Sequence, residues 1–293
     1  MLAIVGTVPD HELPIIHGPL TVDGGQVKLG DRIVEINRGT PALMAAACAT
    51  QEVLTGKAPY GFLVGDIGRG SGSRHLLKYL AEHLPEFEVH ILTLHYLQPI
   101  AHWHDRLLQT IEGLPCRPLL IADAGFMYAA KMSGCAEKYD LFTPDVGELA
   151  FLADESAPHP FYTRGFILHE ENRVPDLVRM AYANKNAARN LLVKGESDYV
   201  VRAGQIVDTV DSPAEEAMEA MGGTGDTLTG IVSALIAAGY GITEASLLAC
   251  KTNRMAGFLA RPTPASNIME IVRHIPAALR QVLGGCRSSV RVL

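Results

Sequence analysis

The residues best suited to chemistry lie in a short segment, here called the glycine turn: Gly222, Gly223, Thr224 and Gly225. Asp226 follows directly, and apolar residues at helical spacing continue to Tyr240. Glycines bring backbone N–H groups close to a ligand, and a helix start adds N–H donors and the positive end of its dipole. The pattern predicts a phosphate-binding turn in which Asp226 takes a proton from an attacking hydroxyl. The alternative is a tight turn with Asp226 as the helix N-cap.

A second glycine-rich segment, GDIGRGSGS at 65–73, follows a predicted strand at 61–64 and precedes a predicted helix at 75–84. Gly68 and Gly70 would allow a phosphate or substrate to approach the backbone closely. A flexible loop whose glycines serve only the turn is the alternative. Neither segment ends in Gly-Lys-Ser/Thr, so neither is a P-loop.

Acidic residues follow two further predicted strands. Asp123 ends the apolar run at 118–122, whereas Asp145 and Glu148 lie within residues 139–148, interpreted as a short strand, a turn and the start of a helix. Ligands bind at the carboxyl ends of parallel strands, so these three side chains are candidates to contact substrate or a hydrated magnesium ion. The alternative for Asp145 and Glu148 is a helix start, where acidic side chains interact favourably with the dipole.

Histidines gather in one region of the chain, at His95, His102 and His104, with Asp105 beside them. Their spacing matches no recognised ligand pattern. We expect no tightly bound metal at these residues.

The composition excludes several classes of protein. Apolar residues make up 48% and charged residues 19%, as in a well-buried globular enzyme, and the net charge of −7 argues against nonspecific nucleic-acid binding. Five cysteines without CxxC pairing indicate reduced thiols, and we do not expect the amino-terminal residues to act as a signal peptide. The longest uncharged run, 227–243, is shorter than the roughly 20 residues of a membrane helix. We expect a cytoplasmic protein with no membrane or nucleic-acid partner.

Strand and helix patterns alternate along the chain. Beyond the elements named above, they predict a strand at 89–94, helices at 175–190 and 267–283, and a hairpin around Ala203-Gly204. They predict an α/β fold with a mainly parallel sheet covered by helices on both faces. Residues 1–293 are expected to form one domain, with a β extension at 1–30. Residues 154–174 lose all periodicity and are interpreted as a loop or insertion over the site.

Several motifs, in this order, resemble the ribokinase-like superfamily and most closely its ADP/ATP-dependent NAD(P)H-hydrate dehydratase branch. The resemblance covers roughly residues 30 to 283. It rests on Gly39–Ala46, PLLIADA at 118–124, the TPDVGE segment within 142–152, LVKG at 192–195, GGTGDTLTG at 222–230, and SNIMEIVRHIPAAL at 266–279.

The resemblance implies a three-layer fold and an adenine nucleotide, ATP or ADP, along the sheet edge. Its phosphates would meet the glycine turn, Lys194 and Gly195 would flank the nucleotide, and Asp226 would act as the base. It also implies Mg²⁺ and a small-molecule substrate. In the dehydratase branch a nicotinamide-ring hydroxyl is phosphorylated and then eliminated.

The sequence departs from the dehydratase pattern on the substrate side. Asp145 stands where the dehydratases carry histidine, which makes the motif more similar to the magnesium motif of the sugar kinases. The segment GDIGRG at 65–70 replaces the GPGLG of the dehydratases, and Asn253-Arg254 replace the expected His-Gly. Residues 86–114 are expected to be an insertion. A kinase for a vitamin or sugar alcohol therefore remains an alternative. So does a nucleotide-binding regulatory protein without turnover. Homo-oligomerisation is left open.

Overall fold

The computed structural model describes residues 1–156 and 174–289. These residues belong to two compact units. Unit 1 comprises Met1–Ile16 and Phe62–Thr209, and unit 2 comprises His17–Gly61 and Val210–Leu293. Most of the segment expected as a loop at 154–174 lies outside the described residues.

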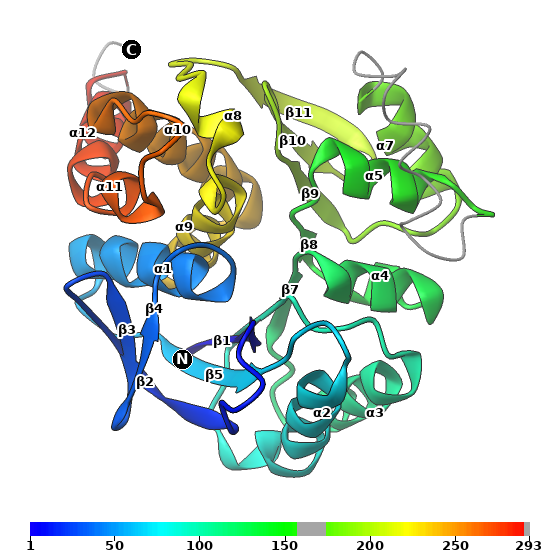
Figure 1. Cartoon of the computed structure of the whole chain (residues 1–293). Coiled ribbons are helices and arrows are strands. Elements are labelled where there is room, and N and C mark those ends of the chain that lie inside the picture. The colour runs from blue at the N-terminus through cyan, green and yellow to red at the C-terminus, as the bar shows by residue number, and fades with distance from the viewer. Residues whose placement is uncertain (157–173, 290–293) are drawn as a thin grey trace. The chain divides into compact units, whose positions relative to one another are not determined.

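Unit 1 alternates strands and helices (Figure 1). Its strands are β1 (Leu2–Val8), β5 (Tyr60–Gly65), β6 (Ile91–His95), β7 (Leu119–Ala122), β8 (Leu141–Phe142), β9 (Asn190–Val193), β10 (Asp198–Arg202) and β11 (Gln205–Val210). Its helices include α2 (Ser71–His83), α3 (Ala101–Glu112), α4 (Gly125–Met132), α5 (Val146–Ala153) and α7 (Val174–Ala183). The sheet order is β11-β10-β9-β8-β7-β6-β1-β5.

The centre of this sheet is parallel, as the sequence predicts. β1 pairs with β6, β6 with β7, β7 with β8, and β8 with β9, all in parallel. Every residue of β6 is buried. Because successive side chains of a strand point to opposite faces, both faces of β6 are covered. The α/β class with a mostly parallel sheet is confirmed, whereas the three-layer arrangement stays a prediction.

At one edge of this sheet, β10 and β11 form a hairpin. β10 runs antiparallel to β9 and is followed by β11. Ala203 and Gly204 between β10 and β11 both have positive φ, of 49° and 81°. Two-residue hairpin turns whose twist matches that of the flanking strands have positive φ at both central residues. The backbone at Ala203 and Gly204 therefore fits the hairpin expected at these residues.

Unit 2 combines a small antiparallel meander with a group of helices. Its elements are β2 (Ile16–Asp23), β3 (Gln26–Leu29), β4 (Arg32–Glu35), α1 (Thr40–Leu54), α8 (Ala217–Ala220), α9 (Thr224–Ala237), α10 (Ile242–Ala260), α11 (Ile268–Val272) and α12 (Ile275–Ser289). β3 pairs antiparallel with both β2 and β4. α1 packs on α9, and α9 on α10 (Figure 1).

Two predicted segments have a different place in the fold from the one expected. The β structure at 1–30 is present, but β1 belongs to the parallel sheet of unit 1, whereas β2 and β3 form the meander. Residues 86–114 contain β6 and α3, so a buried central strand lies within the stretch interpreted as an insertion.

Candidate functional site

The glycine turn begins helix α9 of unit 2. Gly223 is the N-cap, with φ of 104°, a conformation that L side chains rarely adopt. A Cβ on Gly223 would also lie 2.9 Å from Cγ1 of Ile268. The position therefore favours glycine for two reasons. Because Gly223 is the N-cap, Asp226 is the third residue of the helix, and the interpretation of Asp226 as the N-cap is wrong.

Asp226 is anchored to the start of another helix. Its Oδ2 accepts a hydrogen bond of 2.6 Å from the N–H of Gly39, the N-cap of α1, and the residue is 9% exposed. One turn further along α9, a Cβ on Gly230 would lie 2.2 Å from the carbonyl oxygen of Leu43 in α1. The glycine permits the close approach of α1 and α9. The amino termini of these two helices are thus held together.

A cationic side chain lies beside the glycine turn. A Cβ on Gly222 would be 3.3 Å from Cδ of Arg38, and Arg38 is exposed. The first turn of α9 also carries backbone N–H groups that precede the first intrahelical bond, from the N–H of Thr227 to the carbonyl of Gly223. Backbone donors, a helix dipole and a nearby guanidinium suit an anion such as phosphate.

The carboxyl edge of the unit 1 sheet assembles a second group of polar residues, which we call the strand-end cluster: His95, Asp123, Asp145, Glu148 and Lys194. In the parallel register, β6 to β9 end side by side, and Asp145 and Lys194 form an isolated parallel bridge. The sheet thereby brings together residues that are far apart in the sequence.

Asp123 and Lys194 form a buried ion pair in the strand-end cluster. Lys194 Nζ lies 2.8 Å from Asp123 Oδ1 and 3.0 Å from Oδ2, and the two side chains are 12% and 2% exposed. His95 Nε2 is 3.8 Å from Asp123 Oδ2. Burial by itself lowers the pKa of Lys194, but the carboxylates of Asp123 and Glu148 outweigh burial and raise that pKa above its usual value. The lysine is held in its charged form.

Asp145 and Glu148 form a capping box at the start of α5. Glu148 N–H donates to Asp145 Oδ1 at 2.7 Å, and Asp145 N–H donates to Glu148 Oε2 at 2.9 Å. The helix-start interpretation therefore describes part of their role. Tyr128 donates its hydroxyl to Glu148 Oε1 at 3.1 Å. Burial, with the charge of Asp145, raises the pKa of Glu148 to about 8.

The backbone donors of Gly195 and of the 65–73 loop have partners within unit 1. Gly195 N–H donates to Asp198 Oδ1 at 3.2 Å. The N–H groups of Gly68 and Gly70 each donate to Asp66 Oδ1 at 3.0 Å. Asp66 also accepts from the N–H and hydroxyl of Ser73. Since this internal carboxylate occupies the start of α2, the structure does not assign Gly68 and Gly70 to a phosphate.

The histidines of the predicted cluster do not share a site. His104 is fully buried, with Nε2 3.0 Å from the hydroxyl of Tyr139 and Nδ1 3.0 Å from Asp105 Oδ1, and burial lowers its pKa. His102 is exposed, and His95 belongs to the strand-end cluster. Over residues 1–156 and 174–289, no group of three or more His, Cys, Asp or Glu is placed to hold a metal ion.

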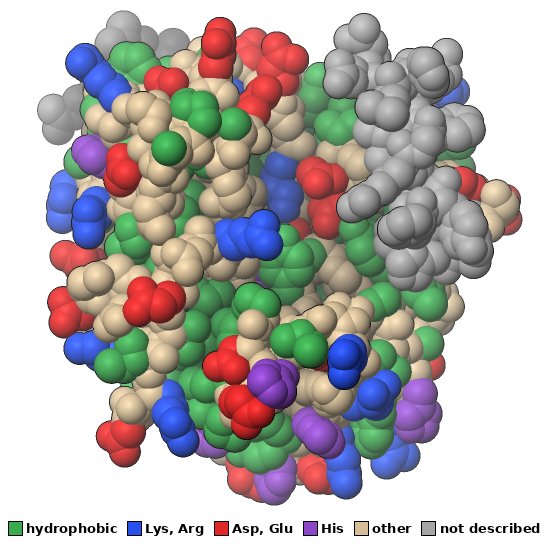
Figure 2. All heavy atoms as spheres, viewed as in Figure 1, with side chains coloured by type: hydrophobic (Ala, Val, Ile, Leu, Met, Phe, Trp, Pro, Cys, Tyr) green, Lys and Arg blue, Asp and Glu red, His purple; other side chains and the backbone are tan. Residues whose placement is uncertain are grey.

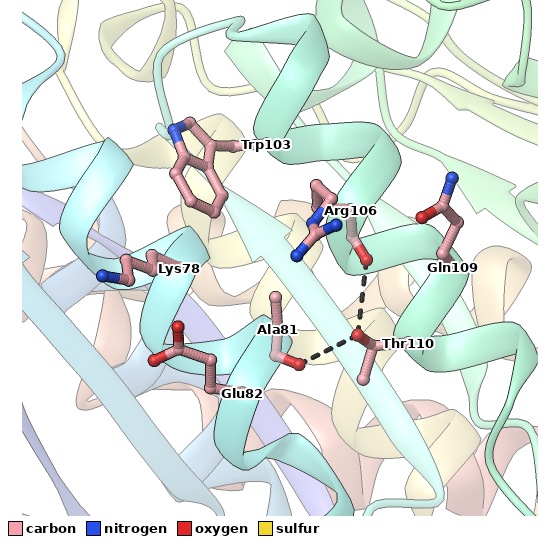
Figure 3. A pocket seen from close by; sticks show the side chains of 7 residues that line it. All are labelled: Lys78, Ala81, Glu82, Trp103, Arg106, Gln109 and Thr110. Carbon is pink, nitrogen blue, oxygen red and sulfur yellow. Dashed lines mark hydrogen bonds between the residues drawn. The ribbon is translucent and has the colours of Figure 1, made fainter.

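A cavity of about 480 Å³ opens between α2 and α3 in unit 1 (Figure 3). It is lined by Lys78, Ala81, Glu82, Trp103, Arg106, Gln109 and Thr110. The Thr110 hydroxyl lies 2.9 Å from the carbonyl oxygen of Ala81 and 3.3 Å from that of Arg106, so it joins α3 to α2. No residue predicted to carry chemistry lines this cavity. Its size alone does not assign it a function.

Further structural findings bear on membrane and nucleic-acid partners. Of the helices in the described ranges, none is long and apolar enough to cross a bilayer. Lys and Arg side chains are interspersed with Asp and Glu on the face drawn in Figure 2.

Among the described residues, Cys48, Cys116, Cys135 and Cys250 are free thiols.

Sequence reasoning missed the structural role of three residues in these two regions. Gly39 was expected only as part of a helix start, although it anchors Asp226. Tyr128 was not singled out, and His95 was grouped with histidines rather than with Asp123. A signal existed for His95, since it directly follows a predicted strand. Nothing in the local pattern pointed to Tyr128, whose partner is twenty positions away.

Comparison with known proteins gives a consistent family. The Carb_kinase family model, described as NAD(P)H-hydrate dehydratase, matches residues 101–276. The uncharacterized protein MJ1337 of Methanocaldococcus jannaschii is 42% identical over 242 residues, which are 82% of this chain and 100% of that protein.

Solved structures similar to this one share its fold at low sequence identity. A ribokinase-like superfamily protein of Enterococcus faecalis has a TM-score of 0.57 and 14% identity, over 96% of this chain and 87% of that one. Phosphofructokinase-2 of Escherichia coli has a TM-score of 0.55 and 15% identity, over 96% and 99%. The ADP/ATP-dependent NAD(P)H-hydrate dehydratase of Bacillus subtilis, co-crystallised with ATP and Mg²⁺, has a TM-score of 0.53 and 16% identity, over 96% and 89%. The fold is ribokinase-like, and the chain belongs to the Carb_kinase family, whose model is described as NAD(P)H-hydrate dehydratase.

Proposed function

We propose that this protein is an ATP- or ADP-dependent enzyme that acts on the hydroxyl group of a small molecule, with hydrated NAD(P)H as the first candidate substrate. One observation carries the proposal. Unit 2 holds Asp226 in the first turn of α9, directly behind the glycine turn, with one carboxylate oxygen anchored by the N–H of Gly39. A carboxylate fixed beside backbone donors for an anion supports a role for Asp226 as a base.

The reaction proposed for this turn is phosphoryl transfer. The substrate hydroxyl oxygen bonds to the terminal phosphorus while the bond from phosphorus to the bridging oxygen of the nucleotide breaks, and Asp226 takes the hydroxyl proton. N–H groups of the glycine turn and the dipole of α9 stabilise the charge on the phosphoryl oxygens. For a hydrated nicotinamide, phosphate then leaves with the C–O electron pair, and loss of a proton from the adjacent ring carbon restores the reduced cofactor.

The strand-end cluster of unit 1 carries charges of its own that fit an electrostatic role. Lys194, kept charged by Asp123, is a fixed cation at the end of β9, and Gly195 continues the same strand end. Asp145 and Glu148 offer the oxygen atoms that Mg²⁺ prefers.

A second candidate, a kinase for a vitamin or sugar alcohol, is favoured by Asp145. This residue replaces the histidine expected in the dehydratase motif, and its carboxylate is joined to Glu148 in the capping box. A kinase would stop after the first half of the reaction, leaving a stable phosphate ester.

The test is to incubate the purified protein with Mg²⁺, ATP or ADP, and hydrated NADH while following the absorbance of reduced nicotinamide. A nucleotide-dependent rise in absorbance with release of phosphate supports the dehydratase. A panel of vitamin and sugar alcohols, with products identified by mass spectrometry, tests the kinase. Absence of turnover in both experiments, with clear nucleotide binding, would instead support the regulatory alternative.

A further inference from the structure

Helix α10 holds the chain segment that contains the glycine turn, residues 211–227, at three points. Asn253, Arg254 and Gly257 make these contacts. Residues 253 and 257 are one turn apart on the helix, and residue 254 is three positions before 257, so the three lie along adjoining faces.

Asn253 joins both ends of the first turn of α9. Its Nδ2 donates to the carbonyl oxygen of Thr224 at 3.1 Å. The hydroxyl of Thr227 lies 2.7 Å from Asn253 Oδ1 and 2.8 Å from that same Thr224 carbonyl oxygen. Asn253 is 6% exposed and Thr227 fully buried, so water does not readily replace these bonds. The two threonines enclose Gly225 and Asp226 in the sequence.

Arg254 and Gly257 hold the approach to the glycine turn. Arg254 is 8% exposed, and one of its guanidinium nitrogens donates to the carbonyl oxygen of Asp211 at 3.2 Å. A Cβ on Gly257 would lie 1.9 Å from Sδ of Met218, so the glycine makes room for that side chain. The Met218 carbonyl in turn lies 3.2 Å from the hydroxyl of Thr224. The segment is held from Asp211 through to Thr227.

We infer that Asn253 and Arg254 are positioning residues that fix the conformation of the glycine turn from α10. They act through Thr224, Thr227 and Asp211 and are not catalytic residues themselves. The two positions are also those at which the sequence carries Asn-Arg where the resemblance leads one to expect His-Gly. The consequence for phosphate binding rests on the proposed function; the positioning itself does not.

The first experiment measures hydrogen exchange of the backbone amides in the peptide covering residues 218–230, without nucleotide. Asn253→Ala removes both bonds and should accelerate exchange there about tenfold or more, because local opening becomes easier. Asn253→Asp keeps an acceptor for Thr227 but loses the amide donor, and should give an intermediate effect. Thr252→Val is the matched control, since Thr252 is fully buried on the same helix and its hydroxyl has no hydrogen-bond partner.

The second experiment compares ADP with adenosine on the same variants. If the glycine turn receives the phosphates, Asn253→Ala should weaken Mg²⁺-ADP binding about tenfold while leaving adenosine binding unchanged. Equal exchange rates at 218–230 in wild type and Asn253→Ala would overturn the positioning role. Faster exchange with no ADP binding even in wild type would uphold that role and refute the proposed function.

Discussion

The glycine turn of unit 2 and the strand-end cluster of unit 1 are built in opposite ways. The glycine turn is one contiguous motif that relies on backbone N–H groups and a single carboxylate. The strand-end cluster consists of charged side chains from separate strand ends, and its lysine and aspartate are buried as a pair. We expect little loss of folding stability when the carboxylate of Asp226 in the glycine-turn region is replaced by a neutral amide. Removing one member of the buried pair Asp123–Lys194 leaves the other charge buried and uncompensated. The two regions should therefore respond differently to mutation.

The largest effect is expected on turnover at Asp226. Asp226→Asn should lower turnover roughly 100- to 10,000-fold, as expected for the loss of a general base. Folding should survive, because the asparagine side chain retains an oxygen for the N–H of Gly39. Nucleotide affinity should stay similar or rise slightly, since one negative charge near the phosphates is removed. Steady-state kinetics and calorimetry on the same preparation measure both quantities.

Asp211→Asn is the control for this variant, since Asp211 lies in the same segment with an exposed side chain. Full activity of Asp226→Asn would mean that the carboxylate only joins α9 to α1.

The next effect is expected on stability in unit 1. Lys194→Met leaves Asp123 buried and without its lysine, and should cost about 3 kcal/mol of unfolding free energy. Changing Asp123 to Asn in the same protein should restore part of that loss. Lys138→Met is the contrast, because its pair with Glu112 is half-exposed, at 46% and 44%, and should be worth less than about 1 kcal/mol. Urea unfolding measures all four proteins, and equal costs for Lys194 and Lys138 would contradict the comparison.

A smaller effect concerns the pH dependence contributed by Glu148. Its pKa is raised to about 8 in the folded protein, above its value in the unfolded chain, so the folded state binds the extra proton between these values. Wild-type stability should therefore fall relative to Glu148→Gln as pH rises from about 4.5 to 8. Lys131, whose pKa burial lowers to about 8, is present in both proteins and cancels in the difference. A difference in melting temperature that stays constant with pH would refute the shift.

The sequence predicted the contiguous parts of the molecule better than the assembled ones. The helix after the glycine turn, the strand before Asp123 and the hairpin at Ala203-Gly204 follow from local periodicity and turn chemistry, and the structure confirms them. The helix expected at 267–283 is instead α11 and α12, because Pro276 has no N–H to donate to the carbonyl oxygen of Val272 and so cannot continue the hydrogen bonding of α11. The helix expected at 175–190 ends at Ala183, and Lys185 there has φ of 57°.

Tertiary pairing decided what local patterns left open. The anchoring of Asp226 by Gly39 joins residues 187 positions apart, and the pairing of Asp123 with Lys194 joins residues 71 positions apart. Strand order made Asp123 a candidate for contact with substrate, and the family resemblance implied that Lys194 flanks the nucleotide. The partner of each could not be predicted, since it depends on the strand register and on the close approach of α1 and α9.

The most direct test of the central claim needs no knowledge of the substrate. Thermal unfolding is measured with and without millimolar ATP or ADP and Mg²⁺, with adenosine as the phosphate-free control. Because a ligand that binds only the folded state stabilises it, by about 2.7 kcal/mol at one hundred times its Kd, the account predicts a clear rise in Tm with ATP or ADP and a smaller one with adenosine. An unchanged Tm with both nucleotides would contradict the claim that the glycine turn is a nucleotide-phosphate site.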